Sequence, residues 1–206
     1  PIVYGMTIGE YAKMINGEGW LANGIQCDLT VVKLKNWDHE TRYELPVAPS
    51  PNLPNMDAVY LYPSLCLFEG TDVSVGRGTD WPFQVIGKPG FEEGKFTFTP
   101  RSIPGVAPHP PYEGQECQGF KLTSFCKSYI KDAEKVYLYW LTGFYEKSKD
   151  KDDFFNNYFD KLAGTDKLRE QIKNDIPVRK IEQSWQEDLK AFKEIREKYL
   201  LYEDFK

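Results

Sequence analysis

Residues 132–144, DAEKVYLYWLTGF, mark a change in the pattern of the chain. From Asp132 onward, apolar side chains recur with the 3.6-residue period of a helix. One stripe at this spacing contains Val136, Tyr137, Trp140, Leu141 and Phe144. Helical patterns continue over residues 152–162, over residues 166–173 with Thr165 as a candidate cap, and from Pro177 onward. The last stripe contains Ile181, Trp185, Leu189, Phe192 and Tyr199. Aromatics at helical spacing are far more often core than a sugar-stacking surface, so we predict that this stripe is buried.

The chain before residue 132 has more strands and loops. Thr7 and Glu10 form a capping box that predicts a helix ending near Asn16-Gly17. Alternation predicts a half-buried strand from Cys27 through about Lys35, and two further strands at 96–98 and 117–125. Residues 55–69 suggest two short helical pieces, and residues 45–54 and 104–116 are proline-rich loops. Strands and helices do not alternate as in βαβ units, which predicts an α+β fold.

The expected architecture is a mixed or antiparallel sheet with long proline- and glycine-rich loops, followed by a helical C-terminal part. We expect one domain over residues 1–206, with residues 1–130 as the strand- and loop-rich part and residues 131–206 as the helical part. A length of 206 residues is ample for a hydrophobic core. Because the chain opens at Pro1 without a methionine, we expect a processed product or an excised domain.

Composition excludes several classes of partner. The formal net charge is −5, which disfavours nucleic acid and anionic membranes. No apolar run approaches the roughly 20 residues that span a bilayer. The four cysteines form no CxxC pair and the chain has only two histidines, so we expect neither a metal site nor a cofactor. Buried free thiols are the expected state, and a disulfide stays open if the compartment is oxidising.

The most polar motif is EGTDVSVGRGTDWPFQVIGKP, from Glu69 to Pro89. Glycines at 70, 76, 78 and 87 allow left-handed backbone angles and close approach of a ligand. Arg77 lies between two of them, and a planar guanidinium with small neighbours suits bidentate binding of a carboxylate or phosphate. A solvated arginine on a surface loop is the alternative. Glu69 remains open as a general acid, a hydroxyl binder or the partner of Arg77.

A second rigid motif is PSPNLP at residues 49–54. Its prolines restrict the backbone, so Ser50 and Asn52 have little conformational entropy left to lose on binding. The amide of Asn52 matches a sugar hydroxyl or an acetamido group. In the alternative interpretation, Asn52 only caps the following helix. The glycine-rich motif lacks the lysine of a P-loop and the spacing of a dinucleotide-binding fingerprint. A Ser-His-Asp triad is not indicated, because His39 lies in a charged run and His109 lies between prolines. The separation of Asp72 and Asp80 cannot be derived from the sequence.

Several motifs together resemble one known family. They are YGMTIGEYA at 4–12, CDLTVV at 27–32, PSPNLP at 49–54, YPSLCLFEGTDVSVGRGT at 62–79, PFQVIGKP at 82–89, and SWQEDLKAF with YLLY near the end. The combination of PSPN with EGT-x-VS-x-GRGT is specific, and the resemblance covers essentially the whole chain. On these motifs the chain is similar to the peptidoglycan exo-β-N-acetylmuramidase family of the NamZ type, formerly known only as a domain of unknown function.

The resemblance implies a role and a missing partner. Family members carry a Rossmann-like N-terminal half whose catalytic glutamate lies in a Gly-Pro-Glu-His-Gly type of motif, and this chain contains no such motif. We therefore expect a C-terminal domain that supplies part of a substrate cleft, is inactive alone and carries no catalytic residue, with Glu69 as the alternative. Members commonly have EGTN where this chain has Asp72, which puts a neutral donor at that position in doubt. The resemblance further implies a periplasmic or secreted glycoside hydrolase of cell-wall recycling.

The expected substrates are saccharides that contain N-acetylmuramic acid. Its lactyl carboxylate is absent from N-acetylglucosamine, and Arg77 is the type of group that recognises this difference. The expected substrate-binding residues are Arg77, Asn52, Ser50, Glu69, Thr71, Ser74 and Thr79. Two alternatives stay open, namely a non-catalytic glycan-binding or interaction domain and a stand-alone hydrolase that uses Glu69.

Overall fold

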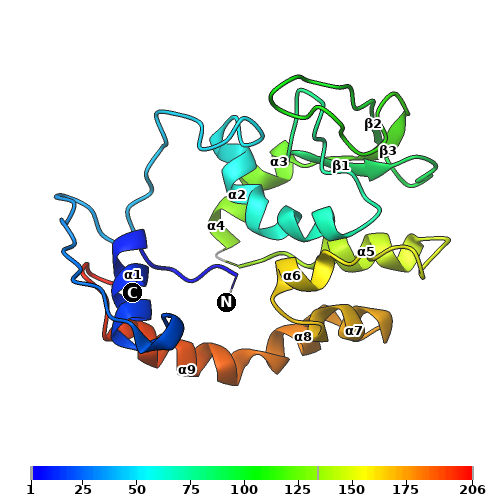
Figure 1. The fold of residues 1–206 in the computed structure, drawn as a ribbon. Coiled ribbons are helices and arrows are strands. Elements are labelled where there is room, and N and C mark those ends of the chain that lie inside the picture. The colour runs from blue at the N-terminus through cyan, green and yellow to red at the C-terminus, as the bar shows by residue number, and fades with distance from the viewer. Residues whose placement is uncertain (1, 134, 206) are drawn as a thin grey trace. The chain divides into compact units, whose positions relative to one another are not determined.

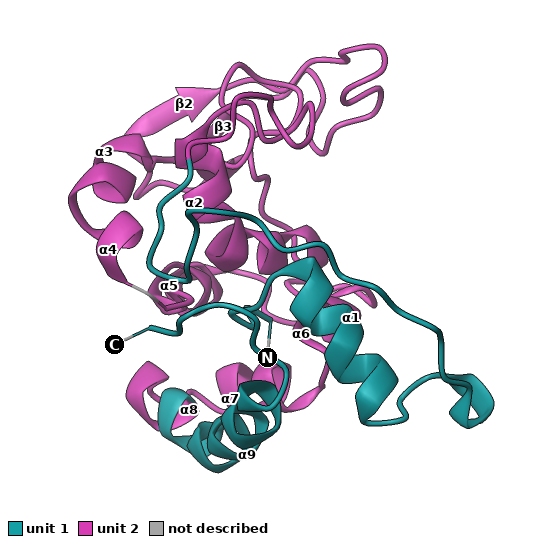
Figure 2. Cartoon of the chain, turned by 90° about the vertical axis from the view of Figure 1, so that its left-hand side faces the viewer, with its two compact units in different colours: residues 1–43, 182–206 teal, residues 44–181 magenta. Residues whose placement is uncertain are grey.

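The computed structural model describes residues 2–133 and 135–205. The chain divides into two compact units (Figure 2). Unit 1 contains residues 1–43 and 182–206, and unit 2 contains residues 44–181. Helices are combined with one three-stranded antiparallel sheet, so the predicted α+β class is confirmed (Figure 1).

The sheet lies in unit 2 and has the order β1-β3-β2. Its strands are β1 (Val85–Lys88), β2 (Phe96–Phe98) and β3 (Cys117–Lys121). The strands predicted at residues 96–98 and 117–125 are present as β2 and β3, although β3 ends at Lys121 and residues 123–125 are already helical. Gly119 sits at the centre of β3, where a Cβ atom would lie only 1.8 Å from the carbonyl oxygen of Ile86. The close approach of β1 and β3 therefore requires glycine at this position.

Strand β1 was not predicted from the sequence. Its residues VIGK follow a glycine-rich motif and precede Pro89, so they resembled the end of a loop. In the structure, Val85 and Ile86 are fully buried, and Val85 packs with Phe98 and Cys117 beneath the sheet. Burial on both sides, rather than alternation, explains why a four-residue strand gave no period-two signal.

Unit 2 contains most of the helices. They are α2 (Met56–Leu65), the 3₁₀ turn η2 (Cys66–Gly70), α3 (Thr123–Phe125), the π-helical turn η3 (Cys126–Ile130), α4 (Lys131–Ala133), α5 (Tyr139–Lys147), α6 (Phe159–Ala163) and α7 (Lys167–Lys173). The two helical pieces predicted over residues 55–69 are confirmed as α2 and η2. Phe68 of η2 meets Phe144 of α5 edge to face, with ring centroids 5.8 Å apart. This contact anchors the segment that leads into the glycine-rich motif.

The two helices predicted around residues 132–162 are shorter than expected. The stripe was predicted from Asp132, but α5 begins only at Tyr139, and Tyr137 instead donates its backbone N–H to Ser64 Oγ at 2.8 Å. The helix predicted over residues 152–162 is wrong for most of its length, because α6 covers only Phe159–Ala163. Residues 154–156 pair instead with the segment that follows η2, through an isolated bridge of Phe155 with Thr71. A tertiary pairing has overridden helical periodicity here.

Unit 1 contains α1 (Ile8–Gly17), the 3₁₀ turn η1 (Ala22–Gly24) and α9 (Gln186–Glu197). The predicted capping box at the start of α1 is confirmed in both directions, between Thr7 and Glu10. The strand predicted from Cys27 to Lys35 is not formed in this structure, because these residues form no ladder with any described part of the chain. A strand needs a neighbour, and alternation in the sequence does not supply one.

The C-terminal helix is also interrupted. A helix α8 (Val178–Ser184) ends before Trp185, whose φ of −104° and ψ of 2° are not helical, and α9 starts at the next residue. Of the predicted stripe, Ile181 is fully buried, while Trp185 and Phe192 are half-buried. The prediction of a fully buried aromatic stripe is therefore wrong beyond Ile181.

Candidate functional site

The glycine-rich motif folds into a tight loop after η2. Gly76 and Gly78 have φ values of +77° and +81°, so the predicted left-handed angles are present on both sides of Arg77. A Cβ atom at Gly78 would lie 2.6 Å from the carbonyl oxygen of Arg101. Gly70 is required for a different reason, since a Cβ atom there would lie 2.5 Å from the Cα of Phe159. The loop is thus fixed at its base and bent by glycines at its tip.

Arg77 and Glu69 form an ion pair at the edge of this loop. Arg77 Nη1 lies 2.7 Å from Glu69 Oε2, and the two side chains are 39% and 22% exposed, respectively. Burial raises the pKa of the Glu69 carboxyl, and the charge of Arg77 opposes this rise. Of the three roles considered for Glu69, the structure shows the ion pair with Arg77.

The ion pair leaves most of the guanidinium available. A guanidinium carries five N–H donors. The bond to Glu69 is the only hydrogen bond that Arg77 makes with the described residues. A half-exposed fork with unused donors is able to bind an anion that approaches from solvent.

Two aromatic rings support the pair, and the sequence analysis missed both. The guanidinium carbon of Arg77 lies 6.0 Å from the ring centroid of Phe83, and Tyr62 meets Phe83 at 5.0 Å. Burial raises the pKa of the Tyr62 hydroxyl, with smaller contributions in the same direction from Cys66 and Glu69. Tyr62, Cys66 and Glu69 recur at helical spacing along α2 and η2, and this spacing was the available signal.

Phe83 carries backbone strain. Its φ is +53°, in a region that is uncommon for bulky residues, and its side chain is buried. Its N–H donates to the carbonyl of Val75 at 2.7 Å, which closes the loop across the Arg77 segment. Strained backbone of this kind concentrates at ligand sites. It cannot be read from the sequence, because nothing in WPFQ indicates a left-handed residue.

The PSPNLP segment holds Asn52 rigidly, as predicted. Its backbone N–H donates to Ser50 Oγ at 3.2 Å, and its side-chain Nδ2 donates to the carbonyl of Val106 at 3.1 Å. The capping interpretation is wrong for Asn52, since Asn55 caps α2 by accepting from the N–H of Ala58 at 3.0 Å. Asn52 Oδ1 is buried and has no partner in the described part of the chain. An orphaned buried acceptor is costly, which makes it a candidate ligand contact.

The three hydroxyl candidates of the loop are occupied with its own backbone. Thr71 Oγ1 donates to the carbonyl of Phe68 at 2.8 Å, and Thr79 Oγ1 donates to the carbonyl of Gly76 at 2.7 Å. Ser74 Oγ accepts from the N–H of Gly76 at 3.2 Å. Ser74 and Thr79 are also buried, whereas Thr71 is half-buried. These side chains shape the loop around Arg77, and direct contact with a ligand stays a prediction.

Asp72 lines a hollow of about 370 Å³ in unit 2. Its carboxylate pairs with Lys88 Nζ at 2.6 Å, and Lys88 also donates to Ser148 Oγ at 2.9 Å. Burial raises the pKa of the Asp72 carboxyl, and Lys88 opposes this rise. The carboxylate at position 72 therefore has its own counter-ion here.

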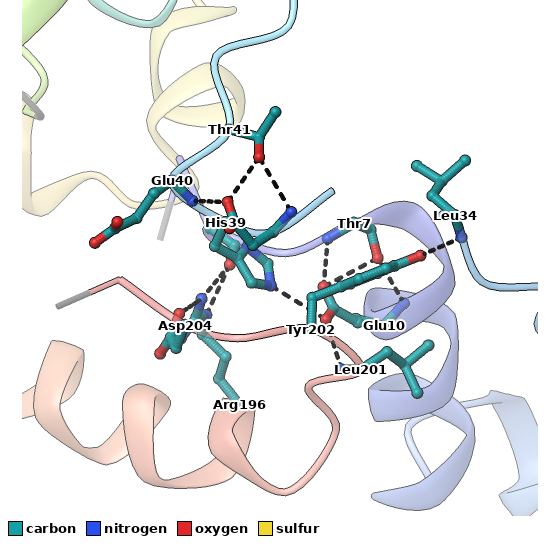
Figure 3. Close-up of polar contacts among 12 residues, drawn as sticks. Thr7, Glu10, Leu34, His39, Glu40, Thr41, Arg196, Leu201, Tyr202 and Asp204 are labelled. Carbon is teal, nitrogen blue, oxygen red and sulfur yellow. Dashed lines mark hydrogen bonds and ion pairs between the residues drawn. The ribbon is translucent and has the colours of Figure 1, made fainter. Parts of the chain in front are cut away.

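Unit 1 contains a buried polar network that the sequence analysis did not anticipate (Figure 3). Glu10 is 0% exposed, and its carboxylate accepts from Thr7 N–H at 2.7 Å, Thr7 Oγ1 at 2.9 Å, His39 Nε2 at 3.1 Å and Leu201 N–H at 2.7 Å. Burial raises the pKa of Glu10, but these hydrogen bonds outweigh it and leave the pKa lowered. The network joins three segments that are remote in sequence.

The described residues contain no group of three or more His, Cys, Asp and Glu side chains that is able to hold a metal ion. All four cysteines are free, and Cys27 is exposed. Within residues 2–133 and 135–205, no helix has the length and apolar character needed to cross a membrane.

Comparison with known proteins identifies the family. Residues 60–202 match the family described as Exo-beta-N-acetylmuramidase NamZ, C-terminal. Residues 1–57 match its companion, Exo-beta-N-acetylmuramidase NamZ, N-terminal. The chain belongs to the NamZ family. The family's own boundary thus falls between residues 57 and 60, just after PSPNLP.

Three relatives of this NamZ-family chain are informative. The Peptidoglycan beta-N-acetylmuramidase NamZ of Bacillus subtilis is 36% identical, over 98% of this chain and 51% of that protein. The crystal structure of a DUF1343 family protein from Bacteroides fragilis has a TM-score of 0.94 at 47% identity, and covers 100% of this chain and 57% of the other. A second DUF1343 structure from that organism shares the fold, with a TM-score of 0.73 at 22% identity over 98% of this chain and 58% of the other. The chain therefore spans about half the length of the relatives it matches.

Proposed function

We propose that this chain forms the C-terminal part of an exo-β-N-acetylmuramidase that releases terminal β-1,4-linked N-acetylmuramic acid from peptidoglycan fragments. The proposal rests on family membership and on one observation in unit 2. That observation is the half-exposed guanidinium of Arg77, which has unused donors, one carboxylate partner and a strained aromatic residue beneath it. In this role Arg77 binds the lactyl carboxylate of the substrate and Glu69 orients Arg77.

In this proposal, the PSPNLP segment at residues 49–54 supplies further contacts to the sugar. Asn52 and Ser50 contact the acetamido and hydroxyl groups of the sugar, because Asn52 Oδ1 has no donor among the described residues. Thr71 is the hydroxyl of the loop that is best placed to add a contact, since Ser74 and Thr79 are more deeply buried. We expect PSPNLP and the Arg77 loop to line one surface.

The catalytic acid belongs to a Rossmann-like N-terminal half in this proposal, and the 206-residue chain alone does not turn over substrate. Glu69 is held by Arg77, and Asp72 by Lys88, so neither carboxylate is free as a member of a hydrolytic pair. We propose a periplasmic or extracellular location, because peptidoglycan itself lies outside the cytoplasmic membrane. Turnover of a chromogenic muramic acid glycoside by the 206-residue chain would instead assign catalysis to Glu69.

The test uses Arg77→Lys in the two-domain protein. Lysine keeps the charge but loses the two-pronged donor, so kcat/KM on N-acetylmuramic acid substrates should fall by about 1–3 kcal/mol of transition-state binding, or roughly five- to 150-fold. Activity on the N-acetylglucosamine analogue should scarcely change, because this analogue has no lactyl carboxylate. The measured quantity is the ratio of the two kcat/KM values.

Arg101→Lys is the matched control. Arg101 also pairs with a carboxylate, Asp80, at 3.0 Å, but its side chain is 67% exposed and is not among the proposed substrate-binding residues. The control should leave the ratio unchanged. Equal losses on both substrates for Arg77→Lys would mean that Arg77 only supports the loop, and an unchanged ratio would refute the carboxylate role.

A further inference from the structure

Residues 28–33, DLTVVK, have unused backbone hydrogen-bonding groups. Within the described ranges, neither the N–H groups nor the carbonyl groups of these six residues make a hydrogen bond to the protein. Most backbone N–H and C=O groups in folded proteins form hydrogen bonds. Six consecutive residues whose backbone groups have no partner therefore need an explanation. In Figure 1 the chain between the 3₁₀ turn η1 and α2 carries neither helix nor strand.

Both ends of this run are fixed. The side-chain amide of Asn16 binds the backbone of Cys27 twice, accepting from its N–H at 2.7 Å and donating to its carbonyl at 2.9 Å. At the other end, the N–H of Leu34 donates to Tyr202 Oη at 2.9 Å. The segment is therefore positioned by the protein on either side, with its own backbone left open in between.

Alternate side chains of the segment have different surroundings. Val31 packs against α1 so closely that a Cβ atom at Gly9 would lie 2.6 Å from Val31 Cγ1. Lys33, two residues on, places its ammonium 5.3 Å from the ring centroid of Tyr202. Val32 and Leu34 are 88% and 61% exposed. The contacts made by Val31 and Lys33, with exposed side chains at residues 32 and 34, follow the two-residue alternation of a β-strand.

The family assignment indicates what completes this strand. Residues 1–57 match the N-terminal NamZ family, yet the whole chain spans only about half of its relatives. The segment thus belongs to a domain of which the relatives carry more. Sheets with a helix on one face commonly carry cover on the other as well, which matches the exposed valine and leucine.

We propose that residues 28–33 form a β-strand that pairs edge to edge with a strand of the remaining part of the N-terminal NamZ domain. The strand supplies main-chain hydrogen bonds, and Val32 and Leu34 enter the apolar interior of that domain. This inference rests on the part of the proposed function that gives the chain an N-terminal partner half. It does not depend on the substrate.

Hydrogen exchange measured by mass spectrometry tests the pairing directly. In the 206-residue chain, the amides of residues 28–33 should exchange at nearly the rate of an unfolded peptide. In the longer protein that includes the whole N-terminal domain, their exchange should slow by on the order of 100-fold. The amides of α1 should be protected in both proteins and serve as the internal reference. Equal and fast exchange of residues 28–33 in the two proteins would overturn the proposal.

A proline variant adds a second readout. Val32→Pro removes one N–H and fixes φ, so it should lower the Tm of the longer protein and abolish the added protection while leaving the Tm of the 206-residue chain unchanged. Gln26→Pro is the matched control, because it lies outside the run and Ile25, with φ −60° and ψ 137°, already has the backbone that precedes proline.

Two further outcomes are decisive. Concentration-dependent protection in the 206-residue chain alone, together with a dimer in size-exclusion chromatography, would overturn the proposal in favour of a second copy. Hydrolysis of the muramic acid glycoside is measured on the same sample of the longer protein. Protection of residues 28–33 without hydrolysis supports the strand pairing and refutes the proposed activity. Hydrolysis without protection supports the proposed activity and refutes the strand pairing.

Discussion

Glu10→Gln probes the buried network of unit 1 with a nearly isosteric change. Each carboxylate oxygen of Glu10 accepts two hydrogen bonds, Oε1 from His39 and Leu201 and Oε2 from the N–H and hydroxyl of Thr7. A glutamine amide has only one oxygen, so its NH₂ must face one of these two pairs of donors. The hydroxyl of Thr7 can rotate and the imidazole of His39 can change tautomer, but a backbone N–H cannot adapt.

The magnitude follows from that count. Whichever way the amide turns, one partly buried N–H, from either Thr7 or Leu201, loses its acceptor inside the protein, at a cost of about 1–3 kcal/mol. The remaining bonds lose their charge assistance, which weakens them further. We expect the free energy of unfolding to fall by about 2–4 kcal/mol in total. Chemical denaturation followed by circular dichroism measures this change.

The pH dependence gives an independent check. The pKa of Glu10 is lowered in the folded protein, so this group contributes stability that is fully present above its unfolded pKa near 4.5. That contribution is lost as the pH falls through the lower folded value. In Glu10→Gln this part of the acid sensitivity should disappear, and the stability gap between the two proteins should narrow below about pH 4.5.

Glu18→Gln, at the C-cap of the same helix, is the control. Glu18 accepts a hydrogen bond from Tyr199 Oη at 2.8 Å, but a glutamine oxygen can still accept it. The loss of stability should be clearly smaller than for Glu10→Gln. A Glu10→Gln protein as stable as the original at pH 7 would refute the reasoning, because it would mean that the buried carboxylate is not needed to satisfy its donors.

Three further predictions concern packing and exposure. Gly119→Ala should abolish or severely reduce folding of unit 2, because the new Cβ atom would lie 1.8 Å from the carbonyl oxygen of Ile86. Thermal unfolding and soluble yield measure this effect, and a Tm within a few degrees of the original would contradict the assigned strand register. Trp185→Ala should cost less than the roughly 3–5 kcal/mol of a fully buried aromatic, because the ring is half-buried, and a larger loss in a denaturant titration would mean that the ring is core after all. A thiol reagent at pH 8 should label only Cys27 in the native protein, because Cys66, Cys117 and Cys126 are buried and burial raises the pKa of each thiol to about 11. Mass spectrometry counts the labels, and rapid labelling of any of the three buried cysteines would contradict their burial.

Local rules were reliable where the deciding contacts lie within a few residues. The capping box of Thr7 and Glu10, the left-handed glycines around Arg77 and the rigid PSPNLP turn all follow from short-range backbone geometry. The α+β class followed from the order of such elements. The same rules failed at residues 27–35 and 152–162, where the outcome depends on which distant segment is available for pairing.

The sequence by itself therefore determined the family, the fold class and the position of Arg77 between two glycines, because each depends on residue identity or on neighbours along the chain. Only the tertiary structure decided the partner of Arg77, the left-handed strain of Phe83 and the orphaned oxygen of Asn52. It also decided that Glu10 binds Leu201 across 191 residues. Contacts of this range depend on how the folded chain returns on itself, and a periodicity or a local propensity carries no information about that path.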